Sequence, residues 1–210
     1  MPAVSVIMPV YNAESFLQEA IESILTQSFR DFEFLIFNDG STDNSKQIIQ
    51  SISDPRIKLF DSDINQGYVS LLNKGIDLAH GKYIARMDAD DIAHPHRLQK
   101  QFDKLEQHPD HVICGTRFTT VGSNQVTALP LEDDDIKLKM LYITPFCHPS
   151  VMIRAAVLKD HQLRYEHDYM PAEDYQLWVT LSDYGKFCNL SESLMHYRVH
   201  HNNISMKERS

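Results

Sequence analysis

The first 91 residues alternate apolar runs with amphipathic stretches, and this alternation constrains the possible folds more than any other feature. Each apolar run is predicted as a buried strand, and each amphipathic stretch, with apolar residues at a period of 3.6, as a helix. A strand–helix–strand order implies parallel pairing with right-handed crossovers. The chain is therefore expected to form an α/β, Rossmann-like and mostly parallel sheet flanked by helices, with strands at Val4–Met8, Phe32–Phe37, Ile57–Phe60 and Tyr83–Met87.

The helices between these strands have recognisable ends. Asn12 is a suitable N-cap for a first helix whose apolar stripe extends from Phe16 to Leu25. The second helix contains Ile48–Ile52, and the third contains Leu71–Leu78. Gly81 is predicted as the C′ residue that ends the third helix.

The second half of the chain is less regular and is predicted to form a small mixed portion. No linker separates two domains, so residues 1–210 are expected to form a single domain. Residues 119–124 suit a hairpin arm or a loop. The predicted elements are helices at Arg97–Gln107, Asp133–Leu141 and Glu173–Tyr184, and strands at Val112–Cys114, Ser150–Ile153 and Leu194–Val199.

The composition excludes several classes of protein. The formal net charge of −9 argues against nucleic-acid binding through the phosphate backbone, which requires a basic surface. No apolar run reaches the ~20 residues of a membrane span, and the N-terminus lacks the pattern of a secretory signal. The three cysteines are far apart and are expected to be reduced core thiols of a cytoplasmic protein.

An acidic cluster follows the fourth predicted strand. Asp88, Asp90 and Asp91 lie within four residues, and like charges about 4 Å apart repel by roughly 1 kcal/mol in water and by several times more in a drier site. Hard oxygen ligands of this kind suit Mg²⁺ or Mn²⁺, and such an ion bridges readily to a diphosphate. The alternative is that Asp90 or Asp91 caps a helix while the other carboxylates are solvated.

Polar residues follow several of the predicted parallel strands at the point where each strand ends. Tyr11 and Asn12 follow the first strand, Asp39 follows the second, and Asp88 follows the fourth. Ligands of open α/β sheets bind beyond the carboxyl ends of the strands. These residues are therefore expected to converge on one site.

Two further sites each have a functional and a structural interpretation. Asp39 could accept a hydrogen bond from a uracil or guanine ring, or it could form an Asx-turn and cap the next helix. Glu173 and Asp174 follow Pro171 at a predicted helix start, where the helix dipole favours acids whatever their function. The functional alternative is a general base that takes a proton from an attacking hydroxyl.

Other common motifs are missing or weak. The 11 histidines contain no HExxH pattern, and the seven glycines contain neither GxGxxG nor GxxxxGK[ST]. His196 and His200 would share one face of a strand, so that one of them could reach the acidic cluster. Trp178 is expected in the core.

Six ordered segments of the chain resemble inverting family 2 glycosyltransferases. The resemblance covers about Val4 to Asn203 and implies the GT-A fold, a nucleotide-diphospho-sugar donor and a divalent metal, Mn²⁺ or Mg²⁺, held by a DxD motif. The first half, 1–91, would bind the nucleotide sugar, and 92–210 would supply the acceptor side and the catalytic base. The six segments are Val4–Ala13, Asn38–Asp43, Gly81–Asp91, Cys147–Met152, Ala172–Tyr175 and Tyr197–His200.

The resemblance also implies a role for each matching position. Asp174 matches the catalytic base, and Glu173 would orient that base or the acceptor. The metal ligands would be Asp88, Asp90 and His200. The donor-binding residues would be Pro9, Tyr11, Asn12, Asp39, Asn65, Asp88, Ala89, Asp90, His148 and Arg198.

The implied activity is inverting transfer of a hexosyl or N-acetylhexosaminyl group, with UDP favoured, in the synthesis of a surface polysaccharide or glycoconjugate. The acceptor would be a saccharide, a lipid-linked saccharide or a protein. The implied location is the cytoplasm, with peripheral contact to the inner membrane left open.

The chain departs from the family pattern at one donor contact and in length. Many members have an arginine before the position of Asn73, where this chain has Leu71-Leu72, and many continue beyond the position of Ser210. The alternatives are a nucleotidyltransferase, which would normally have a basic, glycine-rich loop after the first strand, and a non-catalytic sugar-nucleotide-binding protein.

Overall fold

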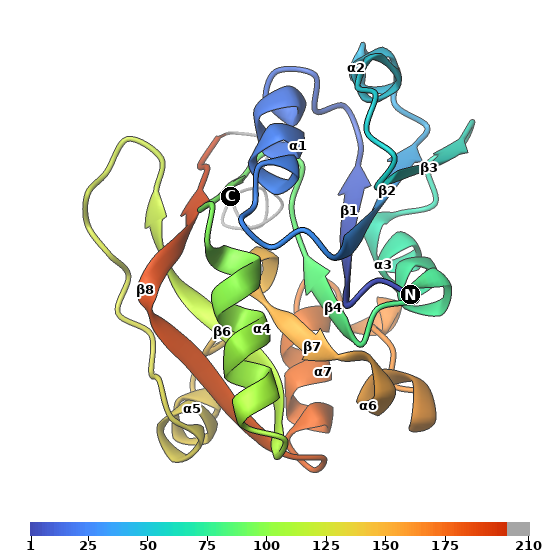
Figure 1. Cartoon of the computed structure of the whole chain (residues 1–210). Helices are drawn as coiled ribbons and strands as arrows, with labels where there is room; N and C mark the ends of the chain where they lie inside the picture. The colour runs from blue at the N-terminus through green and yellow to red at the C-terminus, as the bar shows by residue number, and fades with distance from the viewer. Residues whose placement is uncertain (201–210) are drawn as a thin grey trace.

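A mixed sheet lies between two layers of helices in the structure, a computed structural model that describes residues 1–200 (Figure 1). The sheet of these residues has eight strands in the order β3-β2-β1-β4-β7-β6-β8-β5. The strands are β1 Val4–Val10, β2 Phe32–Asp39, β3 Ile57–Ser62, β4 Tyr83–Arg86, β5 Ile92–Ala93, β6 His111–Thr120, β7 Met152–Arg154 and β8 Lys186–Tyr197.

The helices connect these strands in the predicted order. Arg97–Gln107 is helical over the predicted range, and one helix, Ala155–Asp160, was not predicted. The helices are α1 Leu17–Leu25, α2 Ser45–Ser51, α3 Tyr68–Leu78, α4 Arg97–Gln107, α5 Asp133–Met140, α6 Ala155–Asp160 and α7 Glu173–Leu181, with short 3-10 turns η1 His148–Ser150 and η2 His167–Tyr169.

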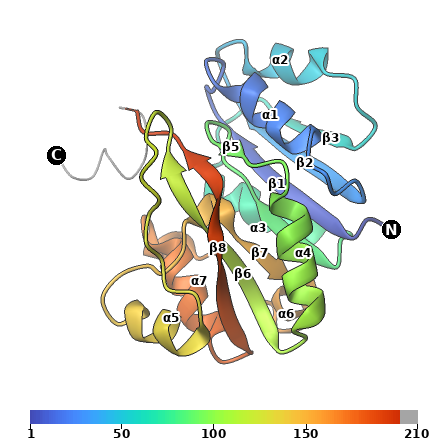
Figure 2. The same cartoon turned by 60° about the vertical axis from the view of Figure 1, so that its left-hand side comes forward.

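The sheet is parallel in its first half and mixed in its second. β3, β2, β1 and β4 pair in parallel, as predicted from the strand–helix alternation. β7 pairs antiparallel with both β4 and β6, whereas β6 and β8 run parallel to one another. The short β5 pairs antiparallel with β8 at the far edge, beside the C-terminal end of β8 in Figure 2.

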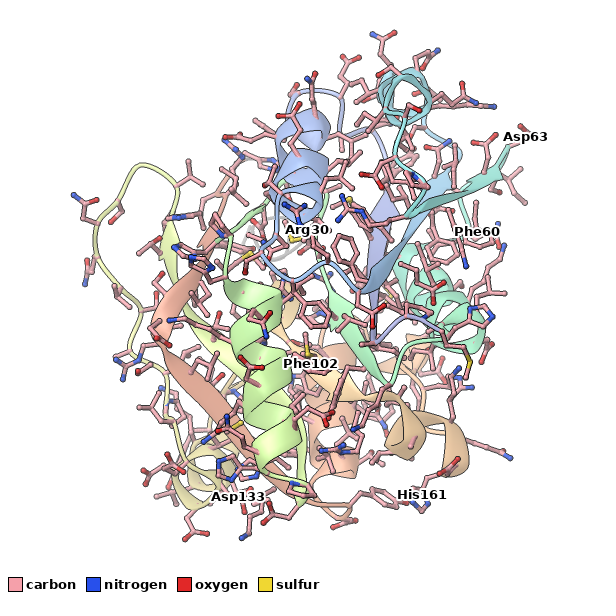
Figure 3. The ribbon with its side chains drawn as sticks, viewed as in Figure 1. Arg30, Phe60, Asp63, Phe102, Asp133 and His161 are labelled. Carbon is pink, nitrogen blue, oxygen red and sulfur yellow. The ribbon has the colours of Figure 1, made fainter. Side chains whose placement is uncertain are left out.

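The two faces of the sheet carry two separate apolar cores. Along β1, Val4, Val6 and Met8 pack on one face together with residues of α1 and α4, whereas Ile7 packs on the other with residues of α3. This follows from the strand period of two, which sends successive side chains to opposite faces. Phe102 of α4, labelled in Figure 3, contributes to the first core by packing its ring 4.8 Å from that of Phe29.

Glu33 ties the amino ends of the strands together, at the edge opposite the cleft described below. Its buried carboxylate accepts hydrogen bonds from Ser5 Oγ (2.6 Å), His80 N (2.7 Å) and Lys58 Nζ (2.7 Å). Burial alone would raise the pKa of Glu33, but these donors outweigh it and lower the pKa to about 2. Ser5 Oγ also accepts a hydrogen bond from Gly81 N (2.9 Å), which holds the α3–β4 turn against β1.

Gly81 is not the C′ residue predicted for α3. The C-cap of α3 is Ala79, and Gly81 is not among the glycines with positive φ. Instead, Gly81 allows close approach of two backbones, because an added Cβ would lie 2.5 Å from Ser5 N and 2.7 Å from Val4 C. The glycine therefore reflects contact with β1 and not the end of a helix.

We expect Gly81→Ala to destabilise the protein by about 1–3 kcal/mol, because backbone atoms have to move to admit the methyl group. Urea unfolding of both proteins would measure the difference. Lys82→Ala is the control, because the Lys82 side chain is exposed and forms a solvent-accessible ion pair with Glu106 and a cation–π contact with Tyr83, both of which contribute little to stability. Equal stability of Gly81→Ala and the wild type would contradict this account of the glycine.

Three other structural expectations have clear outcomes. Cys114, Cys147 and Cys188 are free and buried, as predicted. Trp178 is fully buried and belongs to the core. Within residues 1–200, no helix combines the length and the apolar character that crossing a membrane requires.

Candidate functional site

An open cleft with a volume of about 910 Å³ lies at the carboxyl ends of β1, β2 and β4. These strands run parallel, so the loops that follow them meet at the same edge of the sheet (Figure 1). Every site residue predicted from the sequence lines the cleft except Arg198. The lining members of that set are Pro9, Tyr11, Asn12, Asp39, Asn65, Asp88, Ala89, Asp90, His148, Glu173, Asp174 and His200.

The loop after β1 is held by the loop after β2. Asn12 has a positive φ of 49°, and its Oδ1 accepts a hydrogen bond from Thr42 N (2.8 Å). Asn12 N donates to Ser41 Oγ (3.0 Å). The prediction that Asn12 caps the first helix is therefore wrong, because α1 begins only at Leu17 and Asn12 is used in a long-range contact.

Asp39 is not the cap of α2. The N-cap of α2 is Asn44, and just before it Asp43 Oδ1 accepts a local hydrogen bond from Ser45 N (2.9 Å). The Asp39 carboxylate instead accepts hydrogen bonds from Gln66 N (2.7 Å) and Gly67 N (3.0 Å), which precede α3. It thereby fixes the N-terminal end of α3 at the wall of the cleft.

The three acids after β4 lie close enough to share one cation. One carboxylate oxygen from each of Asp88, Asp90 and Asp91 lies within 4.8 Å of the others. Burial, followed by the charge of Asp88, raises the pKa of both Asp90 and Asp91, and the pKa of Asp91 reaches about 8. Oδ2 of the fully buried Asp91 has no hydrogen-bond partner.

This arrangement fits a divalent metal. Carboxylates that are crowded and buried without compensation are unfavourable, and a doubly charged cation would reverse the sign of that interaction. His200 adds a nitrogen donor, since its Nε2 lies 2.7 Å from Asp90 Oδ2. Oxygen ligands with one imidazole suit Mn²⁺ or Mg²⁺.

Arg86 is a buried cation that lines the cleft beside the acidic cluster. It is the last residue of β4 and is 7% exposed, and its Nη2 lies 2.6 Å from Asp88 Oδ1. Its Nε and Nη1 groups have no hydrogen-bond partner. Its positive charge lowers the pKa of Asp91 and of Asp174, so it acts on both the acidic cluster and the predicted base.

The segment after β8 folds across the acidic loop. Arg198 N donates to Asp91 Oδ1 (2.8 Å), and Arg198 Nε donates to the Asp90 carbonyl (2.8 Å). The guanidinium group also pairs with Glu19 of α1 (2.7 Å). The structure thus places Arg198 behind the acidic loop and outside the cleft lining, and its predicted contact with donor phosphates stays a prediction.

His200 and His196 have different surroundings. The His200 ring packs at a tilt against Phe16, with ring centroids 5.1 Å apart, and its Nε2 contacts Asp90. His196 Nδ1 instead lies 2.8 Å from Thr119 Oγ1. Of the two histidines, His200 is the one that contacts the acidic cluster, although β8 ends at Tyr197, before it. Residues 201–203 of the predicted match lie outside the described residues.

The predicted base lies at the N-terminus of α7 on another wall of the cleft. Burial raises the pKa of Asp174 to about 6, with a further increase from the adjacent charge of Glu173. Tyr175 N donates to Asp174 Oδ1 (2.6 Å), which opposes the shift. A carboxylate with this pKa is ionised at neutral pH but still attracts a proton, as a general base requires.

Glu173 and His148 complete this wall. Glu173 is 3% exposed, and its Oε2 has no hydrogen-bond partner. Burial and the hydrogen bond and charge of Glu173 raise the pKa of the Tyr68 hydroxyl. His148 Nε2 lies 3.0 Å from the Tyr165 hydroxyl, and burial together with the charge of Arg86 lowers the pKa of His148. The imidazole is therefore neutral at neutral pH.

Among the cleft residues that the prediction from sequence omitted, Arg86 and Tyr68 interact with predicted site residues. Arg86 had a usable signal, because a charged residue inside an apolar strand needs a partner. Tyr68 had none, because its proximity to Glu173 depends on how α3 packs beside α7. The roles of the other site residues stay predictions.

Comparison with known proteins assigns the chain to a family. The sequence profile described as Glycosyl transferase family 2 matches residues 5–161. The chain belongs to this family. Family 2 enzymes are inverting glycosyltransferases with the GT-A fold, so the fold and the enzyme class inferred by resemblance are confirmed. An uncharacterized glycosyltransferase of Haemophilus influenzae is 37% identical over 219 residues, covering 97% of this chain and 68% of the relative.

Two solved structures of other proteins have the same fold. S. aureus TarS 1-349 in complex with UDP has a TM-score of 0.79 at 22% identity and matches 96% of this chain. The Pyrobaculum calidifontis mannosyltransferase PcManGT in complex with GDP-Man and Mn²⁺ has a TM-score of 0.75 at 16% identity and matches 97%. This chain spans 61% and 59% of the length of those two chains.

Proposed function

We propose that this family 2 enzyme transfers a hexosyl or N-acetylhexosaminyl group from a nucleotide-diphospho-sugar to an acceptor hydroxyl, with inversion. One observation carries the proposal: a single cleft contains the acidic cluster on one wall and the Glu173-Asp174 pair on another. We expect UDP as the nucleotide and a surface polysaccharide or glycoconjugate as the product.

Each wall has a separate task. Asp88, Asp90 and His200 would hold Mn²⁺ or Mg²⁺, which when bound supplies positive charge for the leaving diphosphate. The loops around Tyr11, Asn12 and Asp39 would bind the nucleoside. Asp174 would take the proton of the acceptor hydroxyl, with its ionisation favoured by Arg86.

A panel of nucleotide sugars tested for Mn²⁺-dependent thermal stabilisation tests this proposal. A ligand that binds the folded state raises the free energy of unfolding by RT ln(1 + [L]/Kd), about 2.7 kcal/mol at 100 times Kd. We expect one nucleotide diphosphate and its sugar conjugates to raise the melting temperature with Mn²⁺ and much less with EDTA. No stabilisation by any member of the panel would refute the proposed donor class.

A further inference from the structure

Exposed apolar side chains gather on two segments that lead into the cleft. We define the apolar rim as Leu138, Leu141, Tyr142, Ile143, Tyr169 and Met170, with exposed fractions of 59%, 71%, 84%, 57%, 53% and 40%. Single exposed apolar residues are ordinary on protein surfaces, but a group of this kind marks an interaction site.

Both segments of the rim are connected to α7, the helix that carries the predicted base: the first by a hydrogen bond, and the second because it precedes α7 in the chain. Ile143 precedes Thr144, and Met170 precedes Pro171, and both of these following residues line the cleft. The Tyr175 hydroxyl of α7 donates a hydrogen bond to the Met140 carbonyl at the end of α5. In Figure 2, α5 and α7 accordingly lie side by side. The rim therefore continues from the wall that carries Asp174.

Local geometry keeps the rim exposed. Tyr142 N and Ile143 N both donate to the Lys139 carbonyl, at 3.0 and 3.1 Å, which winds the chain into a tight turn after α5. Leu141, Tyr142 and Ile143 face solvent on this turn, whereas Met140 before them is buried. The exposure is thus a property of an ordered turn.

We infer that the rim binds the hydrocarbon part of a lipid-linked acceptor; this inference rests on the proposed function. The cleft volume of about 910 Å³ suits a donor and the reacting sugar, so the rest of the acceptor lies outside, beyond Asp174. Four of the six rim residues are aliphatic and offer neither a ring face nor a hydrogen bond to a saccharide.

The charges of α5 agree with this occupant. The acids of the helix, Asp133, Asp134 and Asp135, lie in its first turn, and Lys137 and Lys139 lie in its last turn, next to the rim. Lys137 pairs with Asp133, whereas Lys139 forms no ion pair within residues 1–200. A phosphate group that joins sugar to lipid would meet Lys139 beside the apolar side chains.

Paired acceptors with the same sugar test the inference. Dodecyl and methyl glycosides would be compared as acceptors, below the micellar concentration of the dodecyl compounds. We expect kcat/KM to be about tenfold higher for the dodecyl glycoside, because the rim covers its chain. In the variant Leu141→Ser/Tyr142→Ser/Ile143→Ser, the ratio should approach one, while kcat/KM for the methyl glycoside and stabilisation by the donor stay unchanged.

The control is Val121→Ser/Val126→Ser, which changes apolar residues that are 37% and 44% exposed and lie outside the rim. It should keep the wild-type ratio. The inference would be overturned if the wild type showed equal kcat/KM for the two glycosides, or if the rim variant still preferred the dodecyl glycoside. Either result would assign the rim to a protein partner or to another segment of this chain.

A binding assay separates this inference from the proposed function. Fluorescence titration with dansyl-labelled farnesyl phosphate needs no donor and no transfer, and we expect binding to weaken about tenfold in the rim variant and to persist in Asp174→Asn. Equal binding of farnesyl phosphate by the rim variant and the wild type would refute lipid binding by the rim, even if nucleotide sugars stabilise the protein. If farnesyl phosphate binds but no nucleotide sugar stabilises the protein, only the proposed donor is refuted. Rim-dependent binding to plain phosphatidylcholine vesicles, without a preference for the labelled phosphate, would overturn the acceptor assignment in favour of the bilayer.

Discussion

Replacing Asp174 by asparagine is expected to lower kcat for sugar transfer by about 10²- to 10⁴-fold, the usual contribution of a general base. Asparagine keeps the size of the side chain and an oxygen that accepts the hydrogen bond from Tyr175 N. It does not accept a proton. Because Asp174 and the acidic cluster occupy different walls of the cleft, Mn²⁺-dependent stabilisation by the donor should remain.

The same substitution is expected to stabilise the unliganded protein near neutral pH. The pKa of Asp174 is about 6 when folded and near 3.8 in the ordinary reference state, so the folded protein binds this proton more tightly. The associated stability is fully present below about pH 4 and is lost as the pH rises through 6. Asparagine cannot ionise, so at pH 7–8 it should avoid a cost of about 1–2 kcal/mol after allowance for solvent screening.

Two measurements check this division of roles. In the wild type, the rate should fall as the pH drops below about 6, because Asp174 then becomes protonated and no longer acts as a base. Burial and then the charge of Glu173 raise the pKa of Asp174 to this value. Calorimetry of donor binding should give the same affinity for Asp174→Asn and for the control Asp183→Asn, which changes an exposed acid after α7. Lost donor affinity in Asp174→Asn alone would show that Asp174 belongs to the donor site.

The parallel half of the fold was predictable because its signals are local. Each helix has a stripe of apolar residues that must be buried, and the strands β1, β2 and β4 are covered on both faces. The errors fall where a distant segment decides the local structure. Asn12 caps no helix because Ser41 and Thr42 bind it, and Gly81 ends no helix because β1 lies against it.

The mixed half was less predictable because its pairing is long-range. β8 extends over Lys186–Tyr197, although its middle residues, Ser191 to Ser193, are polar. Register shifts relative to β6 on either side of Arg117 interrupt the alternation that marks a strand. Only the C-terminal part of β8 was therefore recognised from the sequence, as part of the strand predicted at Leu194–Val199.

The candidate site was predictable to the extent that its residues follow strand ends. Parallel strands bring Asn12, Asp39 and Asp88 together through topology alone. The position of the predicted base could not be derived in this way, because tertiary contacts hold α7 at the cleft. One of them is the packing of Trp178 against Phe146, with ring centroids 5.6 Å apart. No local pattern contains that information.

Replacing Asp90 by alanine is expected to remove both the metal dependence of donor binding and the transfer activity. Asp90 contributes one of the three clustered carboxylates and contacts His200, so the variant loses an oxygen ligand and a partner of the nitrogen donor. Stabilisation by nucleotide sugar with Mn²⁺ should fall by about 2–3 kcal/mol at saturating ligand. Transfer should fall by at least about 10²-fold, the usual loss when electrostatic stabilisation of developing charge is removed.

Without metal and nucleotide, the Asp90→Ala variant should not lose stability relative to the wild type. Asp90 repels Asp91, which is one reason why the pKa of Asp91 is raised, so removing Asp90 should leave the metal-free fold as stable as the wild type or more stable. Asp103→Ala on α4 is the matched control, because it removes an exposed aspartate that accepts a hydrogen bond from Gln99 and lies outside the cleft lining. Melting curves with Mn²⁺, with EDTA and with added UDP would separate the two effects. The acidic cluster can hold a shared ion only if its central carboxylate, Asp90, takes part. If Asp90→Ala still melted at a higher temperature with Mn²⁺ and UDP than with EDTA and UDP, the cation would therefore bind elsewhere.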